Sequence, residues 1–152
     1  ARVAVIDCDV HQGNGTASIL RGDDSAFTFS IHGARNFPFE KEESDLDIEL
    51  ADGTGDEEYL RELERGLEET LARSRPQLAI YLAGADPHEG DRLGRLALTK
   101  AGLARRDERV LGELRRRGVP VAIAMAGGYG RDLEDTVDIH AATVLAARRI
   151  FA

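Results

Sequence analysis

The stretch VAVIDCDVHQGNGT, residues 3–16, runs from four consecutive apolar residues directly into two aspartates and a histidine. A short apolar run of this kind is typical of a strand that is buried on both faces. Because side chains alternate along an extended chain, Asp7, Asp9 and His11 are predicted to share one face, with Cys8 on the opposite face. The stretch therefore predicts a buried strand whose carboxyl end carries a group of ionisable side chains.

The rest of the chain alternates between apolar runs and segments with helical spacing of apolar residues. Strands that are apolar throughout and alternate with helices favour a parallel sheet covered on both faces, in a three-layer α/β/α architecture. We expect a buried strand at 121–125 and a long loop over 33–55 that contains one short strand. The predicted strands are 3–6, 26–31, 46–50, 78–82 and 121–125; the predicted helices are 17–20, capped by Thr16, 56–73, 99–117 and 132–150.

Composition narrows the class of protein. The chain has 152 residues, 42% of them hydrophobic, and a net charge of −8, which argues against broad nucleic-acid binding. No apolar run approaches the length of a membrane span. A lone cysteine, Cys8, excludes an internal disulfide and fits a cytoplasmic protein. We expect one α/β domain over 1–152 without a nucleic-acid or membrane partner.

The start of the chain leads to a further expectation. Ala1 stands almost inside the first predicted strand, with no preceding turn or methionine. We therefore expect residues 1–152 to be a fragment of a longer protein.

Polar residues follow three of the predicted strands. Asp9 and His11 follow the first strand, Asp86 follows 78–82, and Tyr129 follows 121–125 in a glycine-rich loop. Ligands of open parallel sheets bind beyond the carboxyl ends of the strands. Two carboxylates and one imidazole would hold zinc and leave a position for water, and a phenol nearby would donate a hydrogen bond to a developing oxyanion.

Three segments in this order resemble the zinc-dependent histone deacetylase family, which includes acetoin-utilisation proteins and acetylpolyamine amidohydrolases. They are DCDVHQGNGT at 7–16, GADPHEGDRLG at 84–94 and AGGYG at 126–130, and the segments 27–39 and 52–60 also match. The pattern is most similar to class IV-like and bacterial members and covers essentially the whole chain. The resemblance implies an arginase/deacetylase-like fold and hydrolysis of the acyl amide of an acetylated lysine protein or a polyamine-like amine.

The resemblance also assigns roles to single residues. It implies zinc ligation by Asp9, His11 and Asp86, and a transition-state role for Tyr129. Asp7 and Asn14 match residues that orient the family's catalytic histidines. The remaining matches are a structural K⁺ site at Asp7, Asp9, His11, Ser30 and Ile31, and a substrate tunnel at Phe37, Gly127 and Gly128.

The sequence departs from the family in one respect that bears on activity. The family's paired catalytic histidines lie upstream of the strand at 3–6, and His32, His88 and His140 are single here. Gln12 and Asn14 stand where many members have histidine and aspartate, a feature of the class IV-like and bacterial branch. The resemblance thus implies that residues 1–152 are the C-terminal part of the family's catalytic domain, with an incomplete sheet, and we expect the isolated chain to have little or no activity.

Two other functions fit part of the pattern. An apolar strand that ends in Asp-x-Asp also opens the haloacid-dehalogenase-like phosphatases, which would use Mg²⁺, Asp7 as nucleophile and a later lysine. The chain has only Lys41 and Lys100, neither after an obvious strand, and that chemistry gives His11 no role. The third possibility is an inactive fragment.

Asp91 and Arg92 are expected to tether the loop that follows Asp86.

Overall fold

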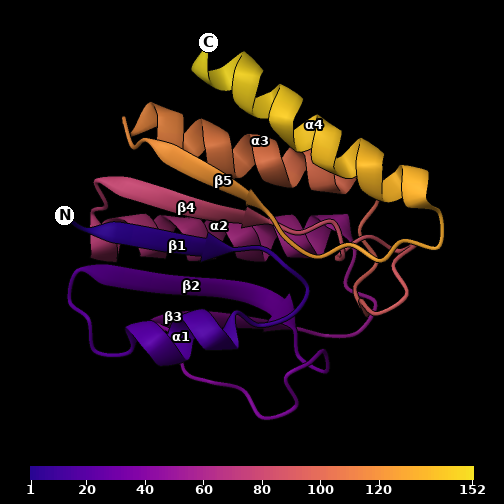
Figure 1. Ribbon diagram of the computed structural model, residues 1–152, viewed down its shortest axis with the longest axis horizontal. Helices are drawn as coiled ribbons and strands as arrows, with labels where there is room; N and C mark the ends of the chain where they lie inside the picture. Colours follow the sequence, from indigo (N-terminus) through magenta and orange to yellow (C-terminus); the bar gives the residue numbers. More distant parts are fainter.

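The computed structural model describes residues 1–152, which form a five-stranded, wholly parallel sheet flanked by four helices (Figure 1). The strand order is β3-β2-β1-β4-β5, so the first strand of the chain lies at the centre. The strands are β1 (Val3–Asp7), β2 (Ala26–Gly33), β3 (Leu46–Leu50), β4 (Leu78–Ala83) and β5 (Val121–Met125); the helices are α1 (Asn14–Leu20), α2 (Asp56–Ser74), α3 (Lys100–Arg116) and α4 (Leu133–Phe151).

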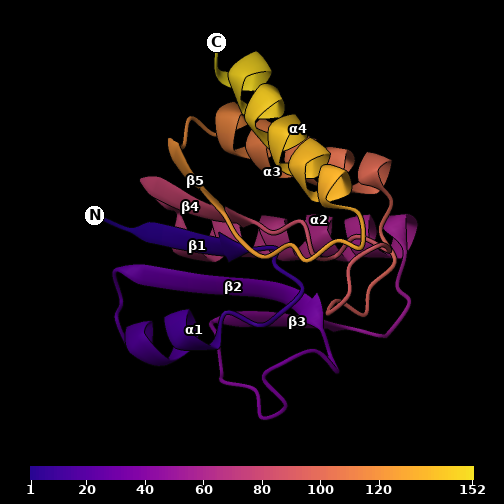
Figure 2. The same ribbon diagram turned by 45° about the vertical axis from the view of Figure 1, so that its right-hand side comes forward.

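The register of the central strand determines which residues meet at the carboxyl edge of the sheet. Asp7, the last residue of β1, pairs with Ser30 of β2 and with Leu82 of β4. Since all the strands are parallel, the segments that follow β1, β4 and β5 leave the sheet at this one edge (Figures 1 and 2). The α/β architecture and the parallel sheet expected from the sequence are confirmed.

One face of the sheet carries the main core. Helices α2 and α3 lie behind the sheet, and α4 packs against α3 on the β5 side (Figures 1 and 2). Phe29, Tyr59, Tyr81 and Leu111 are fully buried in this layer. On the other face only α1 is present, next to β2. None of the helices combines the length and the apolar composition that a membrane-crossing segment needs.

Two local predictions were wrong. Helix α1 begins at Asn14, so Thr16 lies inside the helix and does not cap it; Gly13 precedes the helix without a side-chain cap. The strand at 121–125 is present, but it is not buried: Ala122, Ala124 and Met125 are exposed. The expectation of a sheet covered on both faces fails here, because β5 is an edge strand and no helix covers this side of it.

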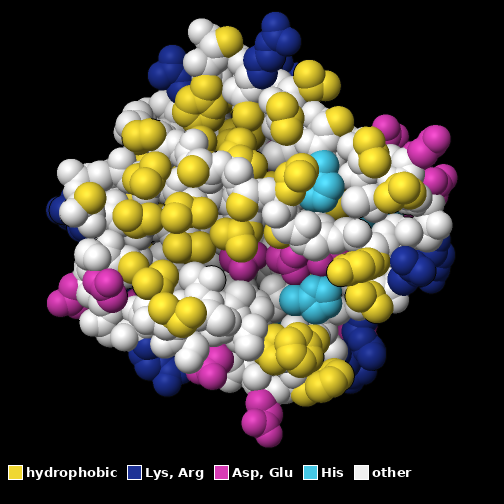
Figure 3. All heavy atoms as spheres, viewed as in Figure 1, with side chains coloured by type: hydrophobic (Ala, Val, Ile, Leu, Met, Phe, Trp, Pro, Cys, Tyr) yellow, Lys and Arg dark blue, Asp and Glu magenta, His cyan; other side chains and the backbone are white.

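The uncovered side of β4 and β5 continues into an apolar surface on α4. In Figure 3 hydrophobic side chains gather over this part of the molecule, and acidic and histidine side chains lie at their margin. A monomeric protein rarely exposes a large contiguous apolar surface. The exposed large hydrophobic residues of these three elements are Leu78, Met125, Leu133, Val137, Val144, Leu145 and Phe151.

Gly66 tests the close packing of α2 on the sheet. A Cβ at this position would lie 2.5 Å from Phe29 Cζ and 2.7 Å from Ile48 Cδ1. We expect Gly66→Ala to lower the free energy of unfolding by about 1–3 kcal/mol through overpacking, measured by urea denaturation. Gly112→Ala on α3 is the matched control, because nothing lies within 4 Å of its added Cβ; it should stabilise the protein by up to about 1 kcal/mol. Equal effects of the two substitutions would contradict close packing at Gly66.

Candidate metal centre

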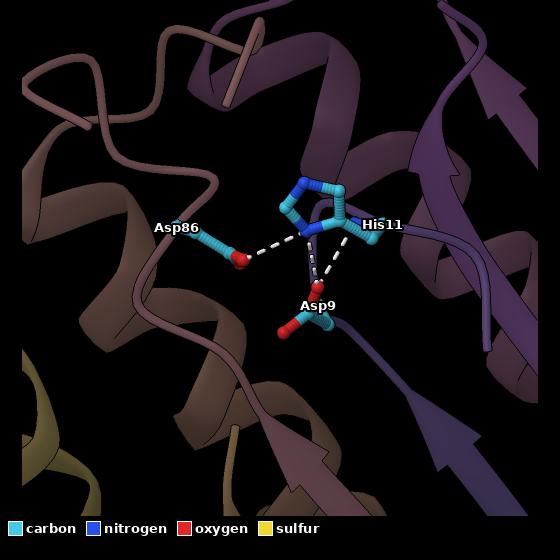
Figure 4. Close-up of side chains that lie close together, drawn as sticks. All are labelled: Asp9, His11 and Asp86. Atoms are coloured by element: carbon cyan, nitrogen blue, oxygen red, sulfur yellow. Dashed lines mark hydrogen bonds and ion pairs between the residues drawn. The ribbon is translucent and has the colours of Figure 1, made fainter. Parts of the chain in front are cut away.

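The centre lies where β1 and β4 end. Cys8 N donates to Leu82 O at 3.0 Å, and this is the last backbone hydrogen bond between the β1 and β4 segments. Asp9 and His11 follow β1, and Asp86 follows β4. Figure 4 shows the three side chains converging from these two segments.

Three atoms of the centre lie close enough to bind one cation. His11 Nδ1 is 3.0 Å from Asp9 Oδ1 and 3.2 Å from Asp86 Oδ2. One ligand atom from each of the three residues lies within 4.8 Å of the others. Asp86 is fully buried, and Asp9 and His11 are half-buried. The structure therefore brings together the three residues that the sequence analysis selected as zinc ligands.

Backbone N–H groups hold the other carboxylate oxygens. Gly127 N donates to Asp9 Oδ2 at 2.7 Å, and Val10 N donates to Asp86 Oδ1 at 2.9 Å. Each carboxylate thus has one oxygen held by the backbone of another segment and one oxygen directed at His11. This arrangement fixes the orientation of the group before any ligand binds.

Gly127 and Gly84 permit the close approach of these segments. A Cβ on Gly127 would lie 2.2 Å from Asp86 Oδ2 and 2.8 Å from Asp9 Oδ2, and one on Gly84 would lie 2.8 Å from the Cα of Asp9. Any side chain at these positions would displace the carboxylates. Gly127, a residue of the expected substrate tunnel, thus lies against the two carboxylates.

The electrostatics of the centre reflect several acids at one strand end. Burial raises the pKa of Asp86 to about 6. Burial works in the same direction on Asp9, but hydrogen bonds from His11 and Gly127 outweigh it and lower the pKa of that carboxyl. Hydrogen bonds to Asp86 and Asp9 raise the pKa of His11 to about 10. The two carboxylates therefore strongly favour a positive charge at the position of Nδ1.

The donor set fits zinc. Two carboxylate oxygens and one imidazole nitrogen are common zinc ligands, and three protein ligands leave a coordination position for water or substrate, as catalytic zinc sites require. The two carboxylates would neutralise the charge of a divalent cation. Asp9, His11 and Asp86 are accordingly the residues that would hold the metal.

Asp7 lies beside this set but is not part of it. Its Oδ1 accepts a hydrogen bond from Asp9 N at 3.0 Å, and burial raises its pKa to about 7. Ser30 lies opposite Asp7 in the sheet, and the buried Ile31 follows it, so these residues of the expected K⁺ site are neighbours. Asn14 is the first residue of α1 and its side chain makes no hydrogen bond with the centre.

The loop that carries Tyr129 is held by the loop that follows Asp86. Tyr129 N donates to Asp91 Oδ2 at 2.6 Å, and Arg92 N and Nε donate to Tyr129 O at 3.1 and 3.2 Å. Asp91 Oδ1 also accepts hydrogen bonds from Leu93 N and Gly94 N, both at 2.7 Å. The tether expected at Asp91 and Arg92 is present, and it extends to the tyrosine loop.

The other residues of the expected substrate tunnel, Gly128 and Phe37, lie elsewhere around the centre. Gly128 lies against α4, where its Cβ would be 2.7 Å from Thr136 Cγ2. Phe37 is exposed and packs edge-to-face on Phe39, with ring centroids 6.3 Å apart. Asn36 was not expected from the sequence; its side chain donates to Leu93 O at 2.9 Å and accepts from Arg95 N at 3.2 Å. No sequence pattern marks Asn36, since asparagine is common in loops.

Gln12 also has a role that the sequence analysis did not assign. Its side chain donates to Glu42 O at 2.7 Å and accepts from Glu42 N at 2.8 Å. It also donates to Asp47 Oδ1 at 3.0 Å. The glutamine therefore fixes the long loop before β3 to the segment that carries His11.

None of the other histidines joins the three candidate ligands. His32 is fully buried, hydrogen-bonds to Ser30 Oγ at 2.9 Å, and has its pKa lowered to about 4 by burial. His88 accepts a hydrogen bond from Gly90 N at 3.2 Å, and His140 lies on α4. No pair of adjacent histidines exists in the chain.

Comparison with known proteins shows the relationships of the chain. A model of the histone deacetylase domain matches residues 1–144. An uncharacterized protein of Picosynechococcus is 45% identical, and the match covers 99% of this chain and 50% of that protein. Histone deacetylase 2 of Arabidopsis thaliana is 36% identical, and the match covers 85% of this chain and 34% of that protein. The structure of an acetylpolyamine aminohydrolase from Burkholderia pseudomallei superimposes with a TM-score of 0.83 at 23% identity, over 99% of this chain and 46% of that one. The chain thus spans half or less of the length of these relatives.

Removal of His11 tests the metal centre. We expect His11→Ala to lower the affinity of the protein for Zn²⁺ at least a hundredfold, because an essential nitrogen ligand is lost. The measurement is competition with a chromophoric chelator. His140→Ala, which removes a histidine from α4, should leave the affinity within about twofold of the wild type, as expected for a residue outside the ligand set. Equal zinc affinity in both variants would contradict the ligand assignment.

Asp91→Ala tests the tether of the tyrosine loop. Loss of the hydrogen bond to Tyr129 N should lower the turnover of the full-length protein by about 10–100-fold, while its zinc affinity stays close to the wild-type value. The matched control is Asp132→Ala at the start of α4, where the carboxylate accepts a hydrogen bond from Glu134 N and none from Tyr129 N, which donates to Asp91. A parallel loss of turnover and zinc affinity in Asp91→Ala would contradict a role limited to the loop.

Proposed function

The chain belongs to the histone deacetylase family, and on that premise we propose that it is the C-terminal part of the catalytic domain of a zinc-dependent amide hydrolase. The proposed reaction removes acetyl groups from the amines of lysine side chains or polyamine-like compounds. The observation that carries the proposal is the convergence of Asp9, His11 and Asp86 beside the loop that holds Tyr129.

The substrate class follows from the relatives and from the charge of the chain. Known members of the family and of the fold include histone deacetylase 2 and an acetylpolyamine aminohydrolase, as their names state. Both classes of substrate release a cationic amine. The acid-rich loop at 40–47 and the net charge of −8 would attract such cations and would not favour nucleic acid. A cytoplasmic location agrees with the buried, unpaired Cys8.

The residues of the chain would divide the chemistry as follows. Zinc held by the three ligands would supply a Lewis acid that polarises a carbonyl and activates water. The phenol of Tyr129 would donate a hydrogen bond to the oxygen on which negative charge develops. Gly127 N and Val10 N would keep Asp9 and Asp86 oriented throughout. We also propose K⁺ binding near Asp7 and Ser30, which pair with each other in the sheet.

Proton transfer would require a group from outside this chain. Asp7 Oδ1 already accepts from Asp9 N, whereas Oδ2 makes no hydrogen bond within the chain and can accept one from an imidazole. A carboxylate in this position orients a histidine base and stabilises its protonated form. The chain spans about half of its relatives' length, and the apolar surface over β4, β5 and α4 is bare, which supports a larger domain that supplies this group.

The phosphatase alternative has less support. Its mechanism needs a lysine near Asp7, but Lys100 pairs with Asp135 and Asp138 on α4, and Lys41 donates to the carbonyls of Asn36 and Pro38. An inactive fragment remains a second proposal for the isolated chain, because no histidine pair lies in it.

Tyr129→Phe tests the proposed reaction. In the full-length protein we expect kcat on an acetyl-lysine peptide or an acetylated polyamine to fall by about 10²–10³-fold, because one donor to the oxyanion is lost. KM and zinc content should change little, since the phenol is not a metal ligand. Unchanged kcat in a variant that holds one equivalent of zinc would exclude the proposed role of Tyr129. Wild-type protein without amide hydrolysis on either substrate would contradict the proposed function.

A further inference from the structure

Helix α3 carries a fully buried guanidinium behind the candidate metal centre. Arg106 has no exposed surface, and neither does its side chain. Charged side chains are almost never fully buried unless they are paired. Such a group on a helix that is otherwise amphipathic calls for a physical explanation.

The guanidinium binds two strand-end carbonyls. Arg106 Nη1 donates to Gly84 O at 2.5 Å and to Cys8 O at 3.3 Å. Both carbonyls lie beyond the last backbone hydrogen bond between β1 and β4, which Cys8 N donates to Leu82 O. Arg106 therefore links the two strands at the point where the sheet no longer does. Cys8 immediately precedes Asp9, and Gly84 lies two residues before Asp86.

Asp107 neutralises this charge and anchors it. Asp107 Oδ1 lies 2.9 Å from Arg106 Nε and 2.8 Å from Nη2. The same oxygen accepts from Tyr81 OH at 2.6 Å, and Oδ2 accepts from Thr143 Oγ1 at 2.5 Å. An unpaired guanidinium here would oppose a divalent cation at the centre; the paired one contributes hydrogen bonds without a net charge. The network joins β1, β4, α3 and α4.

We propose that Arg106, neutralised by Asp107, is a positioning residue that sets the separation of the β1 and β4 ends and thereby the spacing of Asp9 and Asp86. This inference rests on the proposed zinc site. The motion it restrains is the separation of the two segments, which are otherwise linked beyond the sheet by Val10 N donating to Asp86 Oδ1 and by the contact of His11 Nδ1 with Asp86 Oδ2.

The decisive variant is the double substitution Arg106→Met/Asp107→Asn. It removes the link to the two carbonyls without leaving an uncompensated buried charge, a replacement that buried ion pairs often tolerate. The introduced side-chain amide retains a carbonyl oxygen that can accept the hydrogen bond from Tyr81. In the full-length protein we expect a cooperative unfolding transition near the wild-type temperature and a Zn²⁺ affinity that is about 10–100-fold lower. The d–d absorption spectrum of bound Co²⁺ should also change, because it reports the coordination geometry.

Thr143→Val is the matched control, since it disturbs the same network on the side of α4 and leaves Arg106 in place. It should lower the unfolding temperature while the Zn²⁺ affinity and the Co²⁺ spectrum stay as in the wild type. Wild-type affinity and spectrum in a folded double variant would overturn the proposal, as would an equal loss of affinity in Thr143→Val. These readouts use the metal alone, so a failure of the proposed deacetylase reaction would leave them interpretable. Absence of zinc binding by the wild type would instead refute the proposed site itself.

Discussion

The structure depends on the separation of two parallel strands that carry acids at their ends. Up to Cys8 and Leu82, β1 and β4 share sheet hydrogen bonds; beyond them, Asp9 and Asp86 occupy the opening. Burying several carboxylates together is costly unless each one receives hydrogen bonds or a counter-charge. The chain provides backbone N–H groups from Val10 and Gly127 and an imidazole from His11. The tight packing at Gly84 and Gly127 follows from the same requirement, because these donors must approach the carboxylates closely.

Much of the centre could be predicted from the sequence because it follows from the geometry of an extended chain. Alternation placed Asp9 and His11 together and Cys8 on the opposite side, and the parallel order brought Asp86 to the same edge of the sheet. Cys8 is indeed buried in the core behind the centre. The family resemblance added a role for Asp7 that spacing alone does not provide, and this role and that of Tyr129 stay proposals.

What the sequence did not reveal has physical causes. Arg106 is one of many arginines in a chain that is 32% charged, and its neighbour Asp107 makes the pair look like a solvated helix surface. Only the packing of α3 against the strand ends shows that both are buried. The strand at 121–125 was expected to be buried because it is apolar, but apolar composition does not tell whether the covering layer lies within the same chain. Asn36 and Gln12 hold loops through side-chain bonds to distant backbone, and such contacts leave no local pattern.

The distance in sequence between the candidate ligands has a thermodynamic consequence. His11 and Asp86 lie 75 positions apart, and α1, β2, β3, α2 and β4 are formed by the intervening chain. A cation bound by both would act as a reversible cross-link that closes this part of the chain into a loop. Since only the native arrangement presents all three donors, mass action would stabilise the native state by an amount that grows with the logarithm of the free cation concentration. The resistance of this fold to heat and to proteolysis would then follow the supply of metal in its surroundings.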